Sequence, residues 1–208
     1  MSSRRAAIAD SGIRIIARDG VRALTHRAVD REAGIPQGST SYHAKTRIAL
    51  IGLIVDSLAA RATADAEELA RTLDAEFGSD RRIDPAELAR LIAGLVDVLA
   101  SRREDMRARY ALILELDDEP LLRSRLTSGS TVHAVTARLT VTLLARAGIP
   151  ASDEQVEDLL ALTDALVFHR TALDGGASPE AILTRYLSGA AADLRETGET
   201  RVRPSSPR

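Results

Sequence analysis

Apolar side chains recur at helical spacing along most of the chain, which predicts an all-α protein with about nine helices. Residues 4–19 form the first amphipathic segment, and residues 46–76 form a much longer one. The apolar positions are Ala7, Ile8, Ile15 and Ile16 in the first segment, and Ile48, Ile51, Val55 and Leu58 in the second. Gly20 is well placed to end the first helix.

Capping residues mark the starts of several later helices. Asp84-Pro85-Ala86-Glu87 combines a capping carboxylate with Pro at the first helical position. Ser152 opens a capping box, and Ser178-Pro179 opens the last helix. Ends are expected at residues 77–80, 148–150 and 175–176, and a further helix at residues 106–116.

Residues 120–147 are expected to form one longer helical segment with a kink at residues 128–130. Its run of Thr and Val between residues 131 and 142 would also suit a β-strand. We favour a helix because the flanking segments are helical and no partner strand is evident elsewhere.

Residues 24–50, the recognition segment, depart from this apolar pattern. Thr25 is a good N-cap for a short helix, and Gly34-Ile35-Pro36 predicts a tight turn after it. A third helix is expected from Gln37 to His43, and nearly all its side chains are polar. A helix so poor in apolar residues is better explained by hydrogen bonds to a partner than by burial. The pattern is typical of a helix-turn-helix that reads DNA.

Residues 5–51 resemble the N-terminal domain of TetR-family transcriptional regulators. The matching features are the first helix ending at Asp19-Gly20, the Leu24-Thr25 start, the spacing Val29…Ala33-Gly34-Ile35, the run Gln37-Gly38-Ser39-Thr40, the pair Tyr42-His43, and Arg47 before Leu50 and Ile51. Two positions depart from the family pattern. Ser41 stands where many members have Tyr, and Ala44 stands where they have an aromatic residue, which bears on base preference and on packing.

Charged side chains are unevenly distributed along the chain. Residues 1–50 carry nine basic and four acidic side chains, a net charge of +5, whereas the remaining 19 basic and 26 acidic side chains give −7. A basic N-terminal segment followed by an acidic remainder of the chain is suited to binding phosphate at one end of the molecule. Chance segregation of surface charge is the alternative reading.

The resemblance implies DNA-contacting roles for twelve residues. Gln37 would pair with adenine, Ser and Tyr side chains would reach base edges or phosphates, and the Thr40 methyl would meet a thymine methyl. Backbone N–H groups at the start of the second helix, with the basic side chains, would hold phosphates. The set is Thr25, His26, Arg27, Gln37, Gly38, Ser39, Thr40, Ser41, Tyr42, His43, Lys45 and Arg47.

The resemblance also implies a small-molecule pocket in residues 48–195, which we call the body of the protein. Its candidate lining residues are polar or aromatic residues on otherwise apolar helices: Tyr110, Glu115, His133, Asp164, Phe168 and His169. For each of them, an ordinary core or surface position is the alternative. Catalytic and metal chemistry is not indicated, because the chain has no Cys, no metal-ligand His spacing and no nucleophile or phosphate-loop motif. We expect no cofactor, no bound metal and no enzymatic activity.

We therefore predict a ligand-responsive repressor that binds a pseudo-palindromic double-stranded DNA operator as a homodimer, through its last two helices. The predicted domains are residues 1–47 for DNA binding, 48–195 for ligand binding and dimerisation, and 196–208 as a disordered tail rich in Pro, Ser and Arg. The alternative is a helix-turn-helix protein whose body only dimerises or binds a protein partner, without an effector. With no signal peptide and no apolar run long enough to span a membrane, a cytoplasmic location is expected.

Overall fold

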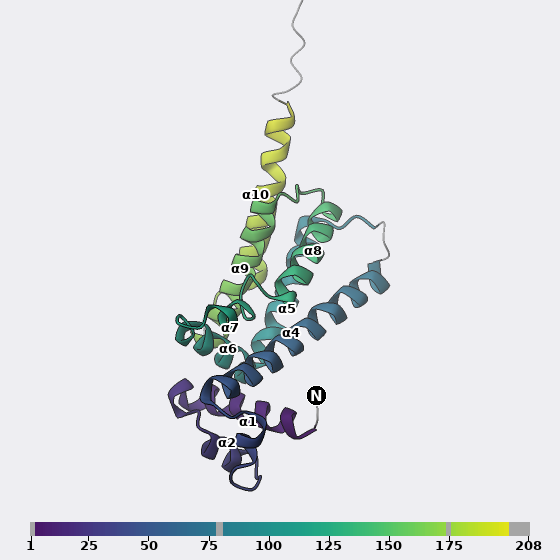
Figure 1. The fold of residues 1–208 in the computed structure, drawn as a ribbon. Coiled ribbons are helices and arrows are strands. Elements are labelled where there is room, and N and C mark those ends of the chain that lie inside the picture. The colour runs from purple at the N-terminus through teal and green to yellow at the C-terminus, as the bar shows by residue number, and fades with distance from the viewer. Residues whose placement is uncertain (1–2, 78–80, 174–175, 200–208) are drawn as a thin grey trace, which may run out of the picture. The chain divides into compact units, whose positions relative to one another are not determined.

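The computed structural model describes residues 3–77, 81–173 and 176–199, and these residues form helices without any β-strand. The all-α prediction is confirmed (Figure 1). In chain order the helices are α1 (Ser3–Asp19), the 3₁₀ helix η1 (Val21–Ala23), α2 (His26–Glu32), α3 (Ser39–His43), α4 (Arg47–Phe77), α5 (Pro85–Ser101), α6 (Arg103–Glu115), α7 (Pro120–Ser124), α8 (Thr131–Arg146), α9 (Asp153–Ala172) and α10 (Pro179–Glu199).

Three of the predicted helix starts are confirmed by side-chain caps. The Thr25 hydroxyl accepts a hydrogen bond from the Ala28 N–H at 3.1 Å, and an Asp84 carboxylate oxygen accepts one from the Glu87 N–H at 2.7 Å. The Ser152 hydroxyl accepts from the Gln155 N–H at 3.3 Å. Each bond satisfies a donor that the first turn of a helix leaves without a backbone partner.

The segment expected as one helix over residues 120–147 is instead two helices, α7 and α8. The chain turns back between them. A Cβ on Gly129 would lie 3.0 Å from the Ser124 Cβ and 3.3 Å from the Ser124 carbonyl oxygen, so the turn passes close to the end of α7. The Thr- and Val-rich run is helical, as predicted, and the hydroxyls of Thr136 and Thr142 donate to carbonyls four residues earlier.

Two predicted features reach the limits of the described residues. The break expected at residues 77–80 falls mostly on residues 78–80, which are outside the described ranges. In the stop expected at residues 175–176, residue 175 is outside these ranges as well. Helix α10 continues to Glu199, into the predicted tail, and residues 200–208 are also outside.

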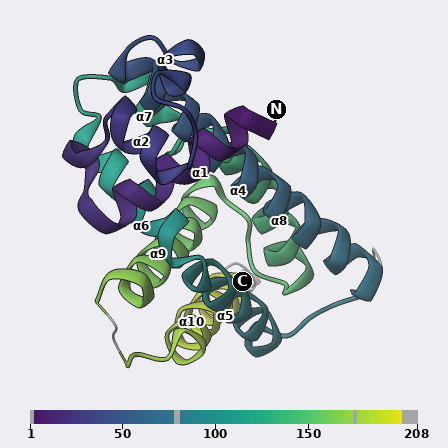
Figure 2. The same ribbon diagram turned by 90° about the horizontal axis from the view of Figure 1, so that it is seen from below.

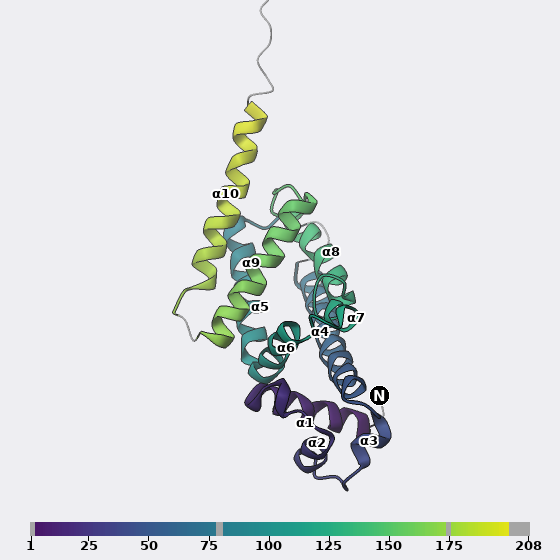
Figure 3. The ribbon, with the colours of Figure 1, turned by 60° about the vertical axis from the view of Figure 1, so that its left-hand side comes forward.

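Packing divides the chain into two compact units, Met1–Arg71 with Leu99–Thr136, and Thr72–Val98 with Ala137–Arg208. The first unit has one apolar core to which α1, α2, α4 and α6 all contribute. Helix α6 packs directly against α1, and α2 packs against both α1 and α3 (Figures 2 and 3). The fully buried side chains of this core include Ile8, Ile16, Leu24, Leu50, Ile54 and Leu112.

Gly12 allows α1 to approach α4 closely. A Cβ at this position would lie 2.3 Å from Cδ1 and 2.8 Å from Cγ1 of Ile54, closer than packed carbon atoms come. Ile54 is itself fully buried, so its side chain has little room to move. The first unit therefore depends on a residue without a side chain at this crossing.

The second unit buries the apolar faces of α5, α9 and α10 with the later turns of α8. Leu88, Val96, Leu144, Leu159, Val167, Leu183 and Leu187 are among its buried residues. A backbone hydrogen bond from the Ile83 N–H to the Arg146 carbonyl, 3.3 Å long, ties the chain before α5 to the end of α8.

These units are defined by packing. The predicted division into residues 1–47, 48–195 and 196–208 is defined by function and stays a prediction. None of the helices in the described ranges is long and apolar enough to cross a membrane.

Candidate nucleic-acid interface

Helices α2 and α3 form a helix-turn-helix in which two glycines make the turn. Gly34 has φ 62° and Gly38 has φ 94°, both in the left-handed region that glycine adopts without strain. Helix α3 begins at Ser39 rather than at the predicted Gln37, because Gly38 in its left-handed conformation is the N-cap. Gln37 and Gly38 therefore belong to the turn, and both are exposed.

Helix α3 presents most of its side chains to solvent. Tyr42 is 83% exposed and Ser41 is also exposed, while Ser39 and His43 are half-buried. The rings of Tyr42 and His43 meet edge to face, with centroids 5.3 Å apart. Within α3, Thr40 alone is buried, with 0% exposure. The helix therefore offers a polar and aromatic face that nothing in its own unit covers.

Asp30 of α2 binds the start of α3. Its Oδ2 accepts a hydrogen bond from the Gly38 N–H at 2.7 Å. Its Oδ1 accepts from the Thr40 N–H at 2.8 Å and from the Thr40 hydroxyl at 2.6 Å. Gly38 has no side chain with which to cap the helix, so the Asp30 carboxylate takes over that role from another helix.

Asp30 is only 3% exposed, and two influences oppose each other at its carboxyl group. Burial by itself raises the pKa of Asp30, because the charged form loses water. The hydrogen bonds from Thr40 and Gly38, with the nearby His26, outweigh burial and lower the pKa below its usual value. Asp30 is therefore a buried carboxylate that stays ionised.

His26 contacts the other end of α3. Its Nε2 lies 2.7 Å from the carbonyl oxygen of Ala44, the residue that ends α3. A carbonyl oxygen only accepts, so Nε2 must carry the proton in this contact. His26 was predicted to contact DNA, and the structure shows it half-buried with this nitrogen already engaged.

The basic residues of the recognition segment lie at its surface. Arg27 and Lys45 are exposed, and Arg47 is exposed although its Nη2 donates to the Val21 carbonyl at 2.9 Å. Thr25 is exposed and caps α2. Eight of the twelve predicted residues are thus exposed, namely Thr25, Arg27, Gln37, Gly38, Ser41, Tyr42, Lys45 and Arg47.

The predicted role of Thr40 needs correction. Its side chain is buried against Asp30, so its methyl group does not lie where it could meet a thymine methyl. Asp30 was not among the residues singled out from the sequence. One signal was available: a helix start at Gly38-Ser39-Thr40 has no side-chain N-cap of its own, so its N–H groups require an acceptor from elsewhere.

Comparison with known proteins agrees with this architecture. A family model described as the C-terminal domain of tetracyclin repressor-like proteins matches residues 84–193, more than half of the chain. The chain belongs to the TetR family of transcriptional regulators. Regulators of the TetR family bind DNA and dimerise, and they are transcription factors rather than enzymes.

Solved structures of TetR-like fold cover nearly all of the chain. The multidrug binding protein EbrR complexed with imidazole is 26% identical, and the match covers 91% of this chain and 96% of that one with a TM-score of 0.61. The same protein complexed with ethidium is 26% identical over 91% and 98%, with a TM-score of 0.57. A TetR-family member from Streptomyces coelicolor A3 is 26% identical over 90% and 98%, with a TM-score of 0.62. No curated protein matches the chain.

The six residues predicted to line an effector pocket in this TetR-family chain fall into two groups. Tyr110, Glu115 and His133 belong to the first unit, and Asp164, Phe168 and His169 belong to the second. Glu115, Asp164 and Phe168 are exposed, and the other three are half-buried. The Arg109 guanidinium lies 5.1 Å from the centre of the Tyr110 ring. The two groups therefore lie in different units.

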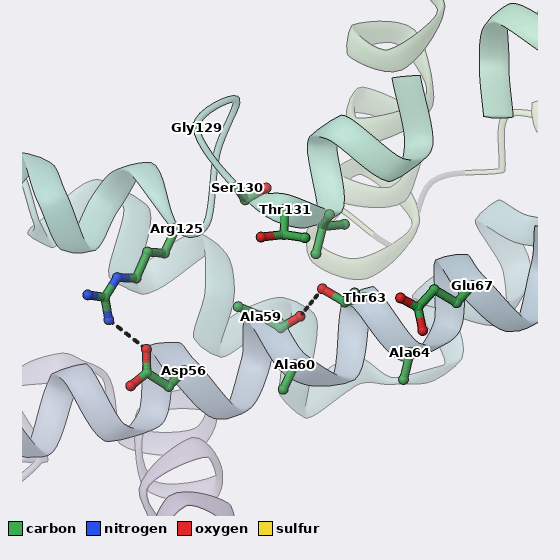
Figure 4. Close-up of a pocket in the computed structure, with 11 residues that line it drawn as sticks. Asp56, Ala59, Ala60, Thr63, Ala64, Glu67, Arg125, Gly129, Ser130 and Thr131 are labelled. Carbon is green, nitrogen blue, oxygen red and sulfur yellow. Dashed lines mark hydrogen bonds and ion pairs between the residues drawn. The ribbon is translucent and has the colours of Figure 1, made fainter. Parts of the chain in front are cut away.

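A groove of about 540 Å³ lies within the first unit, between α4 and the turn from α7 into α8 (Figure 4). Small side chains of α4 line one wall, and Arg125 with residues 129–132 lines the other. Arg125 donates to Asp56 at 2.6 Å at one end, and Glu67 lies farther along α4 (Figure 4). Its lining within the described ranges includes none of the six predicted residues, so sequence reasoning missed this groove.

Proposed function

We propose that the chain is a homodimeric, ligand-responsive repressor that binds a pseudo-palindromic operator through α3. The observation that carries this proposal is the exposed polar face of α3, with Tyr42 at its centre. Side chains on a short helix after a tight turn can reach base edges in the major groove. Two copies would place their recognition helices in successive major grooves, roughly 34–36 Å apart.

The exposed residues divide by the part of DNA that they would contact. Gln37, Ser41 and Tyr42 lie on the side of the turn and α3 that faces solvent, and would read bases, with Ser39 and His43 at the margin. Arg27, Lys45 and Arg47 would bind phosphates, with the start of α2 at Thr25. Thr40 and His26 would support α3 from within.

Dimerisation through α9 and α10 is supported by their surfaces in the single chain. Phe168 of α9 and Leu173, which directly follows α9, are large apolar side chains that remain exposed. Gly189 and Ala192 of α10 are exposed small residues, with Ala190 and Ala191 half-buried between them. Small residues allow close approach of helices, which favours a four-helix contact between two copies.

Replacement of Tyr42 by Ala tests the DNA-binding proposal. The tightest-binding duplex would first be selected from a random library with the full chain. Its affinity for the variant, measured by fluorescence anisotropy, should fall about tenfold or more, because a good contact to a base edge is worth about 1–3 kcal/mol. The melting temperature should not change, because the side chain is almost fully exposed.

Leu121→Ala is the matched control, since Leu121 of α7 is an equally exposed large side chain outside the recognition segment. It should leave DNA affinity unchanged. If Tyr42→Ala bound the selected duplex as tightly as the unaltered chain, the role of α3 in reading DNA would be wrong.

An effector is supported by the groove in the first unit and by the likeness to EbrR, which was solved with imidazole and with ethidium. The groove combines the methyl groups of Ala59, Ala60 and Ala64 with the carboxylate of Glu67. That combination would suit a small organic cation. An effector changes DNA binding only if its affinities for the two conformations differ.

Two ligand titrations separate this proposal from its alternative. Ethidium also binds DNA, so it is titrated into the free protein, and a raised melting temperature is expected. Imidazole is titrated into the complex with the selected duplex, and a change in DNA affinity, read from electrophoretic mobility, is expected. If neither ligand had its expected effect, a C-terminal part that serves only dimerisation or a protein partner would be favoured. We also infer a cytoplasmic location, because the protein would have to reach its DNA operator.

A further inference from the structure

Helix α3 has no buried apolar side chain to fix its orientation. It contains five residues, and within it only Thr40 is buried. Most helical stability in proteins comes from packing of an apolar face, which α3 does not have. Its direction relative to α2 must therefore depend on other interactions.

The hydrogen bonds from α2 supply these interactions at both ends of α3. Asp30 binds the Gly38 and Thr40 N–H groups and the Thr40 hydroxyl at its start. His26 binds the Ala44 carbonyl at its end. Residues 26 and 30 are four positions apart and hence neighbours on one face of α2. We call His26 and Asp30 the polar pair.

We propose that the polar pair sets the orientation of α3 on DNA, so that Asp30 and His26 are positioning residues for base discrimination without touching a base. This proposal rests on the proposed function, since it concerns the same DNA contact. A buried carboxylate with three hydrogen bonds permits few orientations of its partners, because each bond is directional. A second bond at the opposite end removes the remaining rotation.

The effect should be on discrimination more than on binding as such. Arg27 precedes α3 and Lys45 follows it, and phosphate contacts of this kind are independent of sequence. Base contacts from Tyr42 and its neighbours require α3 at one angle. Disturbing the polar pair should therefore weaken binding to the selected duplex and spare binding to unrelated DNA.

The decisive variant is Asp30→Asn. An amide group has one acceptor oxygen, so either Gly38 or Thr40 would face an NH₂ group instead of an oxygen. The ratio of affinities for the selected duplex and for a scrambled duplex should fall about tenfold, the equivalent of one lost base contact. The salt dependence of scrambled-duplex binding should not change, because phosphate contacts are retained.

Glu32→Gln provides a matched control on the same helix. Glu32 is also a carboxylate with a lowered pKa, caused first by its hydrogen bond from Arg14, but its partners Arg14 and Arg18 belong to α1. This variant loses stability without touching α3, so its discrimination ratio should stay at the level of the unaltered chain.

Two conservative pairs distinguish positioning from general damage. Thr40→Ser keeps the hydroxyl that donates to Asp30 and should retain discrimination, whereas Thr40→Val keeps the volume, loses the hydroxyl and should not. His26→Gln keeps a donor for the Ala44 carbonyl and should retain more discrimination than His26→Ala. In ¹H–¹⁵N spectra of the free protein, Asp30→Asn should shift the amide signals of Gly38 and Thr40, and Glu32→Gln should not.

Several outcomes would overturn the proposal. One is an unchanged ratio for a folded Asp30→Asn variant; another is an equal loss of ratio in Glu32→Gln, which would make the effect one of stability. Equal weakening of both duplexes by His26→Ala would assign His26 to phosphate binding instead. Failure of the unaltered chain to select any duplex would contradict the proposed function, and is recognisable before any variant is made.

Discussion

Helices α1 and α3 belong to the same compact unit, yet they are held in place by opposite means. Helix α1 buries seven residues, among them Ile8, Ile13 and Ile16, in a core that it shares with α4 and α6. Helix α3 buries one residue, and that residue is a threonine. Apolar burial fixes α1, while directional hydrogen bonds fix α3.

The difference follows from what each helix must leave free. A helix that reads DNA cannot cover its polar face with the rest of the protein, and α3 has little other surface to bury. Hydrogen bonds with an ionised partner are shorter and stronger than neutral ones and define an orientation with few atoms. Helix α1 has no such constraint, and its buried apolar side chains stabilise the unit to which α3 belongs.

The largest expected effect is on the free energy of unfolding, and it comes from disrupting the apolar core that holds α1. Leu112 of α6 is fully buried in the core that α6 shares with α1. Leu112→Ala should lower the free energy of unfolding by about 2–5 kcal/mol, from lost burial and the cavity left behind. Urea denaturation of the purified chain measures it.

Leu114→Ala on the same helix is the control, because Leu114 is 77% exposed and its truncation should cost less than about 0.5 kcal/mol. The folded fraction of Leu112→Ala should discriminate between duplexes as well as the unaltered chain does. A small loss of stability, similar to that of Leu114→Ala, would show that α6 does not share a cooperative core with α1.

The apolar side was also the part that the sequence predicted well. The spacing of Ile8, Ile15 and Ile16 predicted α1, and the caps at Thr25, Asp84 and Ser152 predicted three further helix starts. A buried stripe shows that a helix is covered, but not by which partner. The packing of α6 on α1, far apart in the chain, was therefore beyond reach of the pattern.

The polar side was harder to predict for a physical reason. An Asp beside a buried Val in an amphipathic helix usually lies at the surface, and its burial here depends on donors eight to ten residues away. Thr40 looked like a DNA-contacting residue because its hydroxyl has the same chemistry as that of Ser41. The groove was missed because its walls are largely alanines, which carry no distinctive chemistry.

The smallest expected effect is a pH dependence of stability, and it tests the hydrogen bonds of Asp30 that hold α3. The pKa of Asp30 is lowered in the folded chain despite the opposing effect of burial. A lowered pKa means that the ionised form stabilises the folded state at a pH above the unfolded pKa of about 3.9, and that this contribution is lost as pH falls through the folded pKa. The stability advantage of the unaltered chain over Asp30→Asn should therefore shrink as pH falls below about 4.

Urea denaturation of both chains at a series of pH values checks this. Glu32 also has a lowered pKa, but it is present in both chains, so its contribution cancels in the difference. His26 is present in both chains as well, and its charge is among the causes that lower the pKa of Asp30. A difference that stayed constant or grew as pH fell would mean that Asp30 is not held as a carboxylate, and that α3 is positioned by other contacts.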